Sequence, residues 1–334
     1  MAHHVDNIYW AEVDPDAVNN ACSVALALVG SNKRVLELGP AAGHVTRALV
    51  ANGCRVVAIE VEAEAATFLH EVTERVIVGD LSDPAVVAAA IDDERFDVVL
   101  GGDVLEHLSD PLRVLRACRA ALKPGGYVVL SLPNIAHADV KLQLLAGRFR
   151  YRESGLLDRT HLHFFTLESI QELVHDAGLV VVDLQRVIVP VFGSEQAVER
   201  ASVSPALLAE VVAEAESETY QFVLRAVAHD GDVEIANLAN RVVELGTARD
   251  RERARRVATE AELESARSAL DQATTALQET TTALQETTTA LQEAIGHAVG
   301  FEAQCHEHAA HVAALQSTRS YRMLGPLRQL FGRR

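Results

Sequence analysis

The chain has 334 residues, a formal net charge of −17 and 49% hydrophobic residues. This size predicts one large domain or a domain with an extension, with enough apolar residues for a buried core. The acidic balance excludes the basic face that binding to nucleic-acid phosphates requires, so we expect no nucleic-acid partner.

The cysteines and the apolar runs indicate the compartment. Cys22, Cys54, Cys118 and Cys305 are scattered and form no CxxC pair. This spacing predicts neither a zinc site nor a disulfide framework and fits a reducing cytoplasm. No apolar run reaches about 18 residues, so we expect no transmembrane helix. The N-terminus lacks the basic-then-apolar pattern of a secretory signal, so we expect none.

The first structural unit centres on residues 34–43. Residues 1–32 precede it as a helical preamble, with Tyr9 and Trp10 ahead of a helix over 17–29. An apolar strand then ends in a turn of small residues, 39–43. Glycine in such a turn lets the backbone lie against a ligand. The carboxyl end of a strand facing a helix N-terminus is where doubly wound sheets bind nucleotides.

Strand and helix patterns alternate up to residue 133. The predicted strands are 34–38, 55–60, 75–78, 96–101 and 127–132. The predicted helices are 44–52, 62–72, 84–91 and 111–122. The runs FDVVL and YVVLSL are continuously apolar, which indicates strands buried on both faces of a parallel sheet. A turn is predicted at 123–126, where the sequence reads KPGG.

The middle of the chain completes the sheet. An irregular, basic and aromatic segment at 133–165 leads to a helix with Thr166 as its N-cap and Gly178 just past its end. Strands are predicted at 180–189 and 220–228, and the second completes the sheet near residue 230. The prediction is therefore an α/β fold with a doubly wound, mostly parallel seven-stranded sheet.

Beyond residue 230 the sequence becomes helical and repetitive. Leucines recur every seven residues, with alanine or threonine three places on. They are Leu263, Leu270, Leu277, Leu284 and Leu291. Such heptads predict a coiled coil that joins copies of the chain into a homo-oligomer; the alternative is a solvated single helix acting as a spacer. His306, His308 and His311 do not converge on one helical face, so we expect them to be solvated.

The predicted domains are 1–230, a helical segment at 231–317 and a basic tail at 318–334. The tail carries five arginines and no acidic residue among apolar side chains. This pattern favours contact with an anionic membrane surface or an acidic partner; the alternative is a disordered basic end. The predicted location is cytoplasmic, with peripheral association at the inner face of the cell membrane.

Several motifs together resemble a known family. They are ELGPAAG at 37–43, VVAIE at 56–60, VGDL at 78–81, FDVVLGGDVLEHLSDP at 96–111, LKPGGYVVLSLPN at 122–134 and DRTHLHFFT at 158–166. Over roughly residues 30–178, their order and spacing resemble class I S-adenosylmethionine-dependent methyltransferases. The heptads and the STRSYRMLGPLRQL tail further resemble methyltransferases of bacterial cell-surface polysaccharide machinery.

The resemblance implies that S-adenosylmethionine is the cofactor. It assigns cofactor binding to Glu37, Gly39, Ala41, Gly43, Glu60, Val61, Asp80, Leu81, Asp103, Val104 and His107. In this assignment Glu60 accepts hydrogen bonds from the ribose hydroxyls, although an acid stabilised by the dipole of the next helix is the alternative. Asp80 and the backbone of Leu81 bind adenine. Ala41 stands where the family usually has glycine.

The same resemblance places acidic residues at the methionine end of the cofactor. Glu37 and Asp103 lie near the ammonium group in this assignment, and Asp103 stands where relatives often have glutamate. Carboxylates suit a ligand that carries both a sulfonium and an ammonium. A dehydrogenase would instead require GxGxxG, which residues 39–43 do not supply.

Methyl transfer depends mainly on alignment of nucleophile, carbon and sulfur. An alkyl hydroxyl acceptor also needs a base. On an extended segment His161 and His163 share one face with Phe165, and their ordinary pKa suits a base near neutral pH. The candidate bases are His161, His163, or Asp158 paired with one of them; the alternative is that the histidines hold the segment by hydrogen bonds. A divalent metal on these three residues is a further alternative, but we expect no metal.

The polysaccharide resemblance implies a sugar hydroxyl as the acceptor. Arginines at 148, 150, 152 and 159 would then bind phosphate or carboxylate groups of the substrate. Two other classes stay open. One is an O- or N-methyltransferase of a small molecule such as a quinone or polyketide, with an apolar pocket. The other is a non-catalytic scaffold that presents the coiled coil.

Overall fold

The structure is a computed structural model of the chain and describes residues 13–17, 19–229 and 233–318. Tyr9, Trp10 and all of the basic tail beyond Thr318 lie outside the described residues. The chain divides into two compact units, 1–254 and 255–334. The domain boundaries expected at residues 230 and 317 stay predictions.

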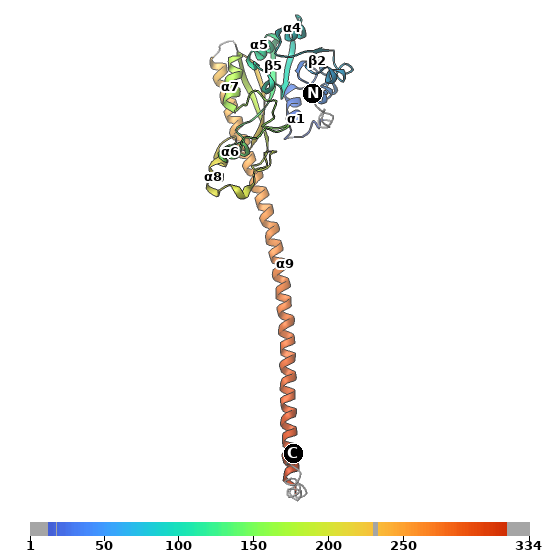
Figure 1. The fold of residues 1–334 in the computed structure, drawn as a ribbon, viewed down its shortest axis with the longest axis vertical. Coiled ribbons are helices and arrows are strands. Elements are labelled where there is room, and N and C mark those ends of the chain that lie inside the picture. Colours follow the sequence, from blue (N-terminus) through green and yellow to red (C-terminus); the bar gives the residue numbers. More distant parts are fainter. Residues whose placement is uncertain (1–12, 18, 230–232, 319–334) are drawn as a thin grey trace. The chain divides into compact units, whose positions relative to one another are not determined.

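One seven-stranded sheet forms the centre of the first unit (Figure 1). Its strands are β1 (Arg34–Leu38), β2 (Arg55–Glu60), β3 (Arg75–Val78), β4 (Phe96–Gly102), β5 (Leu122–Pro133), β6 (Leu179–Ile188) and β7 (Thr219–Ala228). The order across the sheet is β3-β2-β1-β4-β5-β7-β6. β1 to β5 run in parallel, and β7 is antiparallel to both its neighbours. The predicted fold is confirmed, with β7 inserted between β5 and β6.

Helices cover both faces of this sheet. They are α1 (Ala21–Val29), α2 (His44–Ala51), α3 (Ala63–Thr67), α4 (Pro84–Ile91), α5 (Pro111–Ala121), α6 (Ala138–Leu145), α7 (Leu167–Asp176) and α8 (Pro205–Ala213), with short 3₁₀ turns η2 (Leu105–His107) and η3 (Arg200–Ser202). Successive strand residues face opposite layers. Val35 belongs to the apolar cluster of α1, whereas Leu36 belongs to the cluster of α4, α5 and α7.

Several helices begin at caps that the sequence itself supplies. Asp83 Oδ1 accepts a hydrogen bond from the Ala85 amide (2.9 Å), and Asp110 Oδ1 accepts one from Arg113 (3.0 Å). Each cap precedes a proline at the first helical position, where a missing amide hydrogen has no cost. These starts hold the loops that follow β3 and β4.

The local pattern was wrong in several places. The helix expected over 17–29 begins at Ala21, and α8 was not expected. The helix expected over 62–72 ends at Thr67. Beyond it, the amides of Phe68 and Leu69 bond to carbonyls only three residues back (3.1 Å each), so the four-residue helical spacing stops. The segment expected to be irregular contains α6. The turn at 123–126 lies within the bounds of β5, where Gly125 has φ +78° and the register with β4 shifts.

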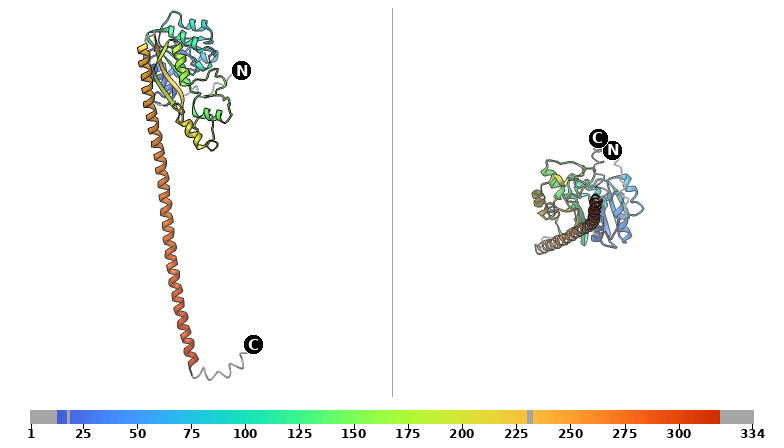
Figure 2. Two further views of the ribbon diagram at one scale, coloured as in Figure 1. Left: turned by 90° about the vertical axis from the view of Figure 1, so that its left-hand side faces the viewer. Right: turned by 90° about the horizontal axis from the view of Figure 1, so that it is seen from below.

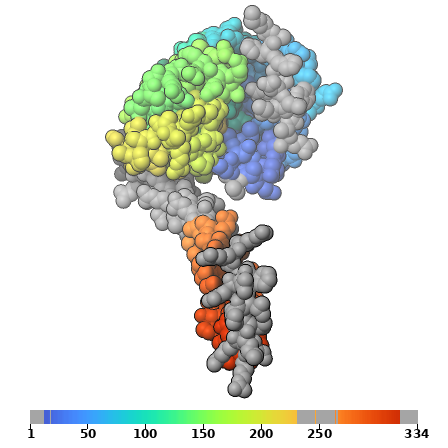
Figure 3. Space-filling model, turned by 60° about the horizontal axis from the view of Figure 1, so that its bottom comes forward, coloured from blue at the N-terminus to red at the C-terminus, as the bar shows by residue number. Residues whose placement is uncertain are grey.

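Helix α6 is held by contacts that are distant in sequence. The buried Asp139 carboxylate accepts hydrogen bonds from the amides of Phe192 (2.7 Å) and Ser194 (3.1 Å). Apolar residues of α6 and α8 pack together, and their green and yellow surfaces adjoin in Figure 3. This packing supports the segment that leads to residues 147–165.

The second unit is helical up to Ser317 (Figure 2). Its helix belongs to α9 (Val233–Ser317), so the helical prediction is confirmed, while the coiled coil stays a prediction. The five heptad leucines are 53–68% exposed. Threonine hydroxyls along α9 donate to carbonyls about one turn back, such as Thr281 to Leu277 (2.7 Å). Within the described residues, no helix is long and apolar enough to cross a membrane.

Candidate functional site

The carboxyl ends of β1, β2 and β4 meet at one edge of the sheet. The strand order reverses between β1 and β4, and such a reversal opens a crevice outside the strand ends. The loops after β1 and β4 approach closely there. A Cβ on Gly39 would lie 2.9 Å from Val104 Cγ2, so only glycine fits.

The turn after β1 has three residues with left-handed backbone. They are Gly39 (φ +62°), Ala41 (φ +47°) and Gly43 (φ +79°). The Gly39 amide donates to the Ile59 carbonyl (2.9 Å), which ties the turn to β2. Ala41 adopts a conformation that costs a residue with a Cβ about 1–2 kcal/mol. The turn therefore forms with alanine at this position, but under strain.

Glu60 ends β2 and points at this turn. Its Oε2 accepts a hydrogen bond from the Ala41 amide (2.8 Å), and its Oε1 accepts one from the Glu62 amide (2.9 Å). The side chain is only 5% exposed. Each oxygen keeps a second lone pair, so both remain able to accept from a ligand hydroxyl. Glu62 lies at the start of α3. The hydrogen bond from its amide therefore also fits the alternative role of Glu60, an acid stabilised by the dipole of the next helix.

Glu37 lies buried beneath the turn. Its Oε2 accepts a hydrogen bond from the Thr46 hydroxyl (2.7 Å). Desolvation raises the pKa of Glu37 to about 7, and the negative charge of Glu60 acts in the same direction, while the bond from Thr46 opposes it. A nearby cation would relieve this cost, because it favours the ionised carboxylate.

Asp103 follows β4 with left-handed backbone (φ +54°). Its Oδ1 accepts a hydrogen bond from Gln221 Nε2, and the same nitrogen contacts Ser131 Oγ (2.6 Å). Desolvation raises the pKa of Asp103, against hydrogen bonds from Ser131 and Gln221 and the charge of His107. The residue as a whole is exposed, so a ligand has access to it.

Sequence reasoning missed Gln221 and Ser131. The available signal was a glutamine beside the apolar run FVL in β7, TYQFVLRAVA. Buried polar side chains need partners, so such a residue marks a contact across the sheet.

The predicted adenine-binding residues lie at the neighbouring strand end. The Gly79 amide donates to the Glu60 carbonyl (2.9 Å), which joins the ends of β2 and β3. Asp80 is exposed, and its Oδ1 accepts from the Ser82 amide (2.7 Å). Leu81 belongs to the core, whereas Val61 is 62% exposed. The structure thus brings Glu60, Asp80 and the turn to one edge of the sheet.

A cluster of one carboxylate and two imidazoles lies after β4. One side-chain ligand atom each from Glu106, His107 and His161 lies within 4.8 Å of the other two. The rings of His107 and His161 meet edge to face at 4.8 Å. His107 Nδ1 contacts the Thr160 carbonyl (3.3 Å) and hydroxyl (3.1 Å). Glu106 was missed, although it directly precedes His107 in the DVLEH motif.

The electrostatics of this cluster are unusual. Desolvation raises the pKa of Glu106 well above its ordinary value, and the charges of Asp103 and Asp158 add to the effect. Desolvation also lowers the pKa of His161, with the charge of His107 in the same direction and Asp158 and the Leu156 backbone opposing it. His161 is therefore a neutral imidazole at neutral pH.

The other predicted catalytic residues have different surroundings. The His163 ring stacks on Phe165, with centroids 6.0 Å apart, while the His161 ring lies 6.0 Å from Phe164. Asp158 Oδ1 accepts from the Thr160 amide (2.7 Å) and hydroxyl (2.6 Å). Within the described residues, the donor atoms that lie together around His161 come from Glu106 and His107 rather than from His163 and Asp158.

The four arginines predicted to bind the substrate, at 148, 150, 152 and 159, divide into two groups. Arg152 donates to the Gln196 carbonyl (3.2 Å), and Arg159 donates to Glu153 Oε1 (2.5 Å). Arg148 and Arg150 are exposed. Arg159 is exposed as well, but it is paired with Glu153, so substrate binding by these arginines stays a prediction.

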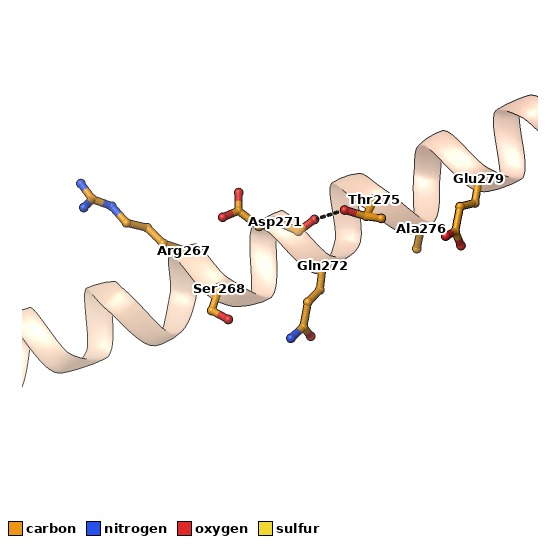
Figure 4. A pocket seen from close by; sticks show the side chains of 7 residues that line it. All are labelled: Arg267, Ser268, Asp271, Gln272, Thr275, Ala276 and Glu279. Atoms are coloured by element: carbon orange, nitrogen blue, oxygen red, sulfur yellow. Dashed lines mark hydrogen bonds between the residues drawn. The ribbon is translucent and has the colours of Figure 1, made fainter.

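A shallow hollow on α9 offers no comparable arrangement. Figure 4 shows its seven lining side chains, all from one helix, with the Thr275 hydroxyl donating to the Asp271 carbonyl (3.0 Å). One helix cannot enclose a ligand, so we assign no function to it.

Comparison with known proteins identifies the fold and its relatives. Residues 15–184, just over half of the chain, match the family described as methyltransferase domain. Ubiquinone biosynthesis O-methyltransferase of Cereibacter sphaeroides is 30% identical over 154 residues, which cover 45% of this chain and 61% of that enzyme. The enzyme of the same name from Paraburkholderia phymatum is 27% identical over 157 residues, covering 46% of this chain and 68% of that protein.

Among solved structures, a 1,6-didemethyltoxoflavin N1-methyltransferase of Burkholderia thailandensis with bound S-adenosylhomocysteine is 21% identical. The aligned region covers 67% of this chain and 82% of the toxoflavin methyltransferase chain, with a TM-score of 0.42. Magnesium protoporphyrin IX methyltransferase from Synechocystis is 14% identical, covers 62% and 81%, and has a TM-score of 0.42.

Proposed function

Since the chain belongs to the methyltransferase domain family, we propose that it transfers a methyl group from S-adenosylmethionine to an acceptor hydroxyl. One observation carries this proposal. The Glu60 carboxylate reaches across from β2 to the Ala41 amide (2.8 Å), at the crevice between the strand ends. A buried acceptor beside a glycine-rich turn fits a ribose, whose hydroxyls donate hydrogen bonds.

The residues around the crevice fit the proposed cofactor. Glu60 would bind the ribose and Asp80 the adenine, while Glu37 and Asp103 would face the ammonium group. Burial raises the pKa values of Glu37 and Asp103. A bound cation would favour the ionised forms of both carboxylates, so both suit a positively charged ligand. Because Gly39 has no side chain, the Val104 side chain can approach it closely, which holds the loops after β1 and β4 together at the crevice.

S-adenosylmethionine supplies an activated methyl carbon when bound. The acceptor oxygen forms a bond to that carbon as the carbon–sulfur bond breaks, and the electron pair stays on sulfur. The hydroxyl proton leaves to a base, for which we propose His161 or His163, with Asp158 holding Thr160 and thereby the segment around them. His161→Ala and His163→Ala are compared in turnover; if neither lowers it about a hundredfold, this base assignment fails.

The surface beside the histidines favours an apolar acceptor. Ring contacts link Tyr151 to Phe149 (5.3 Å), Phe149 to Phe164 (6.0 Å) and Phe164 to His161 (6.0 Å). Tyr151 and Phe149 are 53% and 43% exposed. An aromatic row that ends at a candidate base suits a small phenolic acceptor, because aromatic rings stack on one another. The names of the similar ubiquinone O-methyltransferases support this choice.

A sugar hydroxyl of a cell-surface glycan or its precursor is the second candidate. Arg148 and Arg150 favour it, because exposed guanidinium groups beside the site would bind phosphate or carboxylate of a linked saccharide. Incubation with labelled S-adenosylmethionine and either hydroquinones or cell-envelope extract separates the two. Label in the hydroquinone supports the small-molecule acceptor, and label in saccharide supports the glycan.

Calorimetry tests the enzyme against the scaffold alternative. We expect S-adenosylmethionine to bind, and Glu60→Gln to weaken it; no binding by the wild-type chain would favour a scaffold. A matched control is Glu74→Gln. Glu74 pairs with Arg34 (3.2 Å) and Arg55 (3.5 Å) away from the turn and should leave cofactor affinity unchanged.

We also propose that α9 pairs with α9 of a second copy in a parallel coiled coil. The leucine register continues past Leu291 through exposed Phe301 (69%), Val312 (52%) and Leu315 (63%). From 269 to 290 the positions flanking the seam are alanine and threonine, so no like charges would face each other. Exposed leucines on one stripe need a partner, and a second copy presents the same stripe.

The basic tail completes the proposal. Because its residues beyond Thr318 lie outside the described part, the argument is compositional. Five arginines among apolar residues would bring a coiled-coil dimer of a cytoplasmic enzyme to the inner membrane surface, or to an acidic partner. Binding to anionic vesicles, compared with neutral ones, tests this location.

A further inference from the structure

Glu106, which follows β4, is a buried acid for which the proposed function gives no role. Glu106 is 1% exposed. Among the residues that the structure describes, nothing forms a hydrogen bond with its Oε2 or with the buried Nδ1 of His161. Buried polar atoms are almost always bonded, and a bound ligand would satisfy both of these unpartnered atoms at once.

We propose that Glu106, His107 and His161 bind a divalent transition-metal ion. One carboxylate and two imidazoles are the donor set that Zn²⁺, Mn²⁺, Co²⁺ and Fe²⁺ accept, whereas Ca²⁺ and Mg²⁺ prefer oxygen. Three protein ligands leave open positions on the ion, which is typical of sites that also hold a substrate.

The local geometry prepares the ligands. His107 Nδ1 is engaged by Thr160, and an N–H donated to the Thr160 carbonyl (3.3 Å) leaves Nε2 as the free donor atom. Metal-binding histidines commonly hold a backbone carbonyl or carboxylate in this way. The Thr160 hydroxyl in turn donates to Asp158 Oδ1 (2.6 Å). Asp158 would therefore orient the His107 ligand through Thr160 without binding the ion itself.

The segment that carries His161 is also fixed to Glu106. The amides of Leu162 and His163 both donate to the Glu106 carbonyl, at 2.8 and 3.0 Å. Donors on one ion lie about 3–3.5 Å apart, given metal–donor lengths of about 2.1 Å. The donor atoms now lie within 4.8 Å of one another, so binding an ion would draw them closer by about 1–2 Å.

A cation would offset the negative charge that collects here. Asp103 and Asp158 both act electrostatically on the buried Glu106. The proposal that an ion binds here is based on this geometry alone. The proposal that the ion takes part in methyl transfer also rests on the proposed function. There the ion would lower the pKa of an acceptor hydroxyl. A His161 nitrogen that binds metal accepts no proton, so the proton would go to His163 or to solvent.

Cobalt titration of the full chain, followed by its visible absorption, tests the site. We expect one binding event in the wild type that Glu106→Gln, His107→Ala and His161→Ala each weaken on the order of a hundredfold. His163→Ala is the matched control and should keep it. His306, His308 and His311 are shared by every variant, so any binding there cancels. Equal titration of the wild type and all three ligand variants would overturn the proposal.

Further measurements separate this inference from the proposed function. Circular dichroism and melting establish that each variant is folded. Chelation of the wild type should lower methyl transfer while leaving S-adenosylmethionine binding intact; undiminished transfer would overturn the catalytic role of the ion. Cobalt binding at these residues without methylation of any acceptor would uphold the site and refute the proposed function.

Discussion

The two units of this chain use leucine in opposite ways. In the first, Leu36 and Leu115 are 0% exposed between sheet and helices. In α9, Leu277 and Leu284 are 67% and 68% exposed. The first unit buries these leucines within its own core, whereas the second presents a regular leucine stripe that none of the described residues covers. The contrast predicts that changes in one unit alter ligand binding and changes in the other alter assembly.

The strongest test of this contrast lies in α9. The double variant Leu277→Asp/Leu284→Asp would place charges in the seam, and burying unpaired charge costs several kcal/mol. We expect the dimer to dissociate fully by light scattering while calorimetry shows unchanged S-adenosylmethionine affinity. Gln278→Asp/Gln285→Asp, one position along, is the control and should stay dimeric. A wild-type chain that is already monomeric would refute the assembly proposal.

Pairing direction has its own measurement. Cys305 is exposed and falls on the leucine register, fourteen residues after Leu291. In a parallel, in-register pair, mild oxidation should link two Cys305 side chains and give a dimer on a non-reducing gel. An antiparallel pair would leave the chains unlinked.

In the first unit the largest effect should come from Glu60. Glu60→Gln keeps the size but removes the charge that accepts from Ala41 and Glu62. Hydrogen bonds to a charged group are worth about 1.5–3 kcal/mol, so cofactor affinity should fall about 10–100-fold. Oligomer size should not change. Unaltered affinity in calorimetry would remove Glu60 from the cofactor site.

A smaller effect concerns pH and the buried Glu37. Its pKa is raised from 4.5 to about 7. The stability that this group contributes is therefore full below about pH 4.5 and is lost as the pH rises through about 7. A cofactor ammonium favours the ionised form, so affinity should weaken as the pH falls from 8 to 6. In Glu37→Gln this dependence should flatten; a slope equal to that of the wild type would place the cofactor elsewhere.

The smallest predicted change is at the strained turn. Ala41→Gly would relieve the left-handed backbone at φ +47°. The relief of about 1–2 kcal/mol is partly offset by the greater entropy of glycine when unfolded. Unfolding by denaturant should show a gain of about 1 kcal/mol or less. The same change at Ala276 on α9 should instead reduce helicity; a loss of stability at residue 41 would contradict the strain.

Local patterns accounted for the scaffold and part of the site. Strand 96–101, with its apolar run, and the turn at 39–43 could be placed because each signal lies within ten residues. Glu60 could be placed because it ends such a strand. The bond from Gln221 to Asp103 joins residues 118 apart, and the approach of His161 to Glu106 depends on a loop folding back. Neither has a local periodic signal. Helix α6 escaped detection for the same reason, because the distant Phe192 and Ser194 amides bond to its Asp139.

The position of β7 imposes an order on how the chain is made. β6 leaves the ribosome about forty residues before β7, the strand that pairs with it among the described residues and separates it from β5. Until Thr219–Ala228 has been synthesised, the edge of β5 stays open, and an open edge invites pairing with other chains. That late strand also carries Gln221, the donor to Asp103. A nascent chain stopped before it would hold most of the fold but an unfinished crevice, so the site is completed only when translation has all but reached α9.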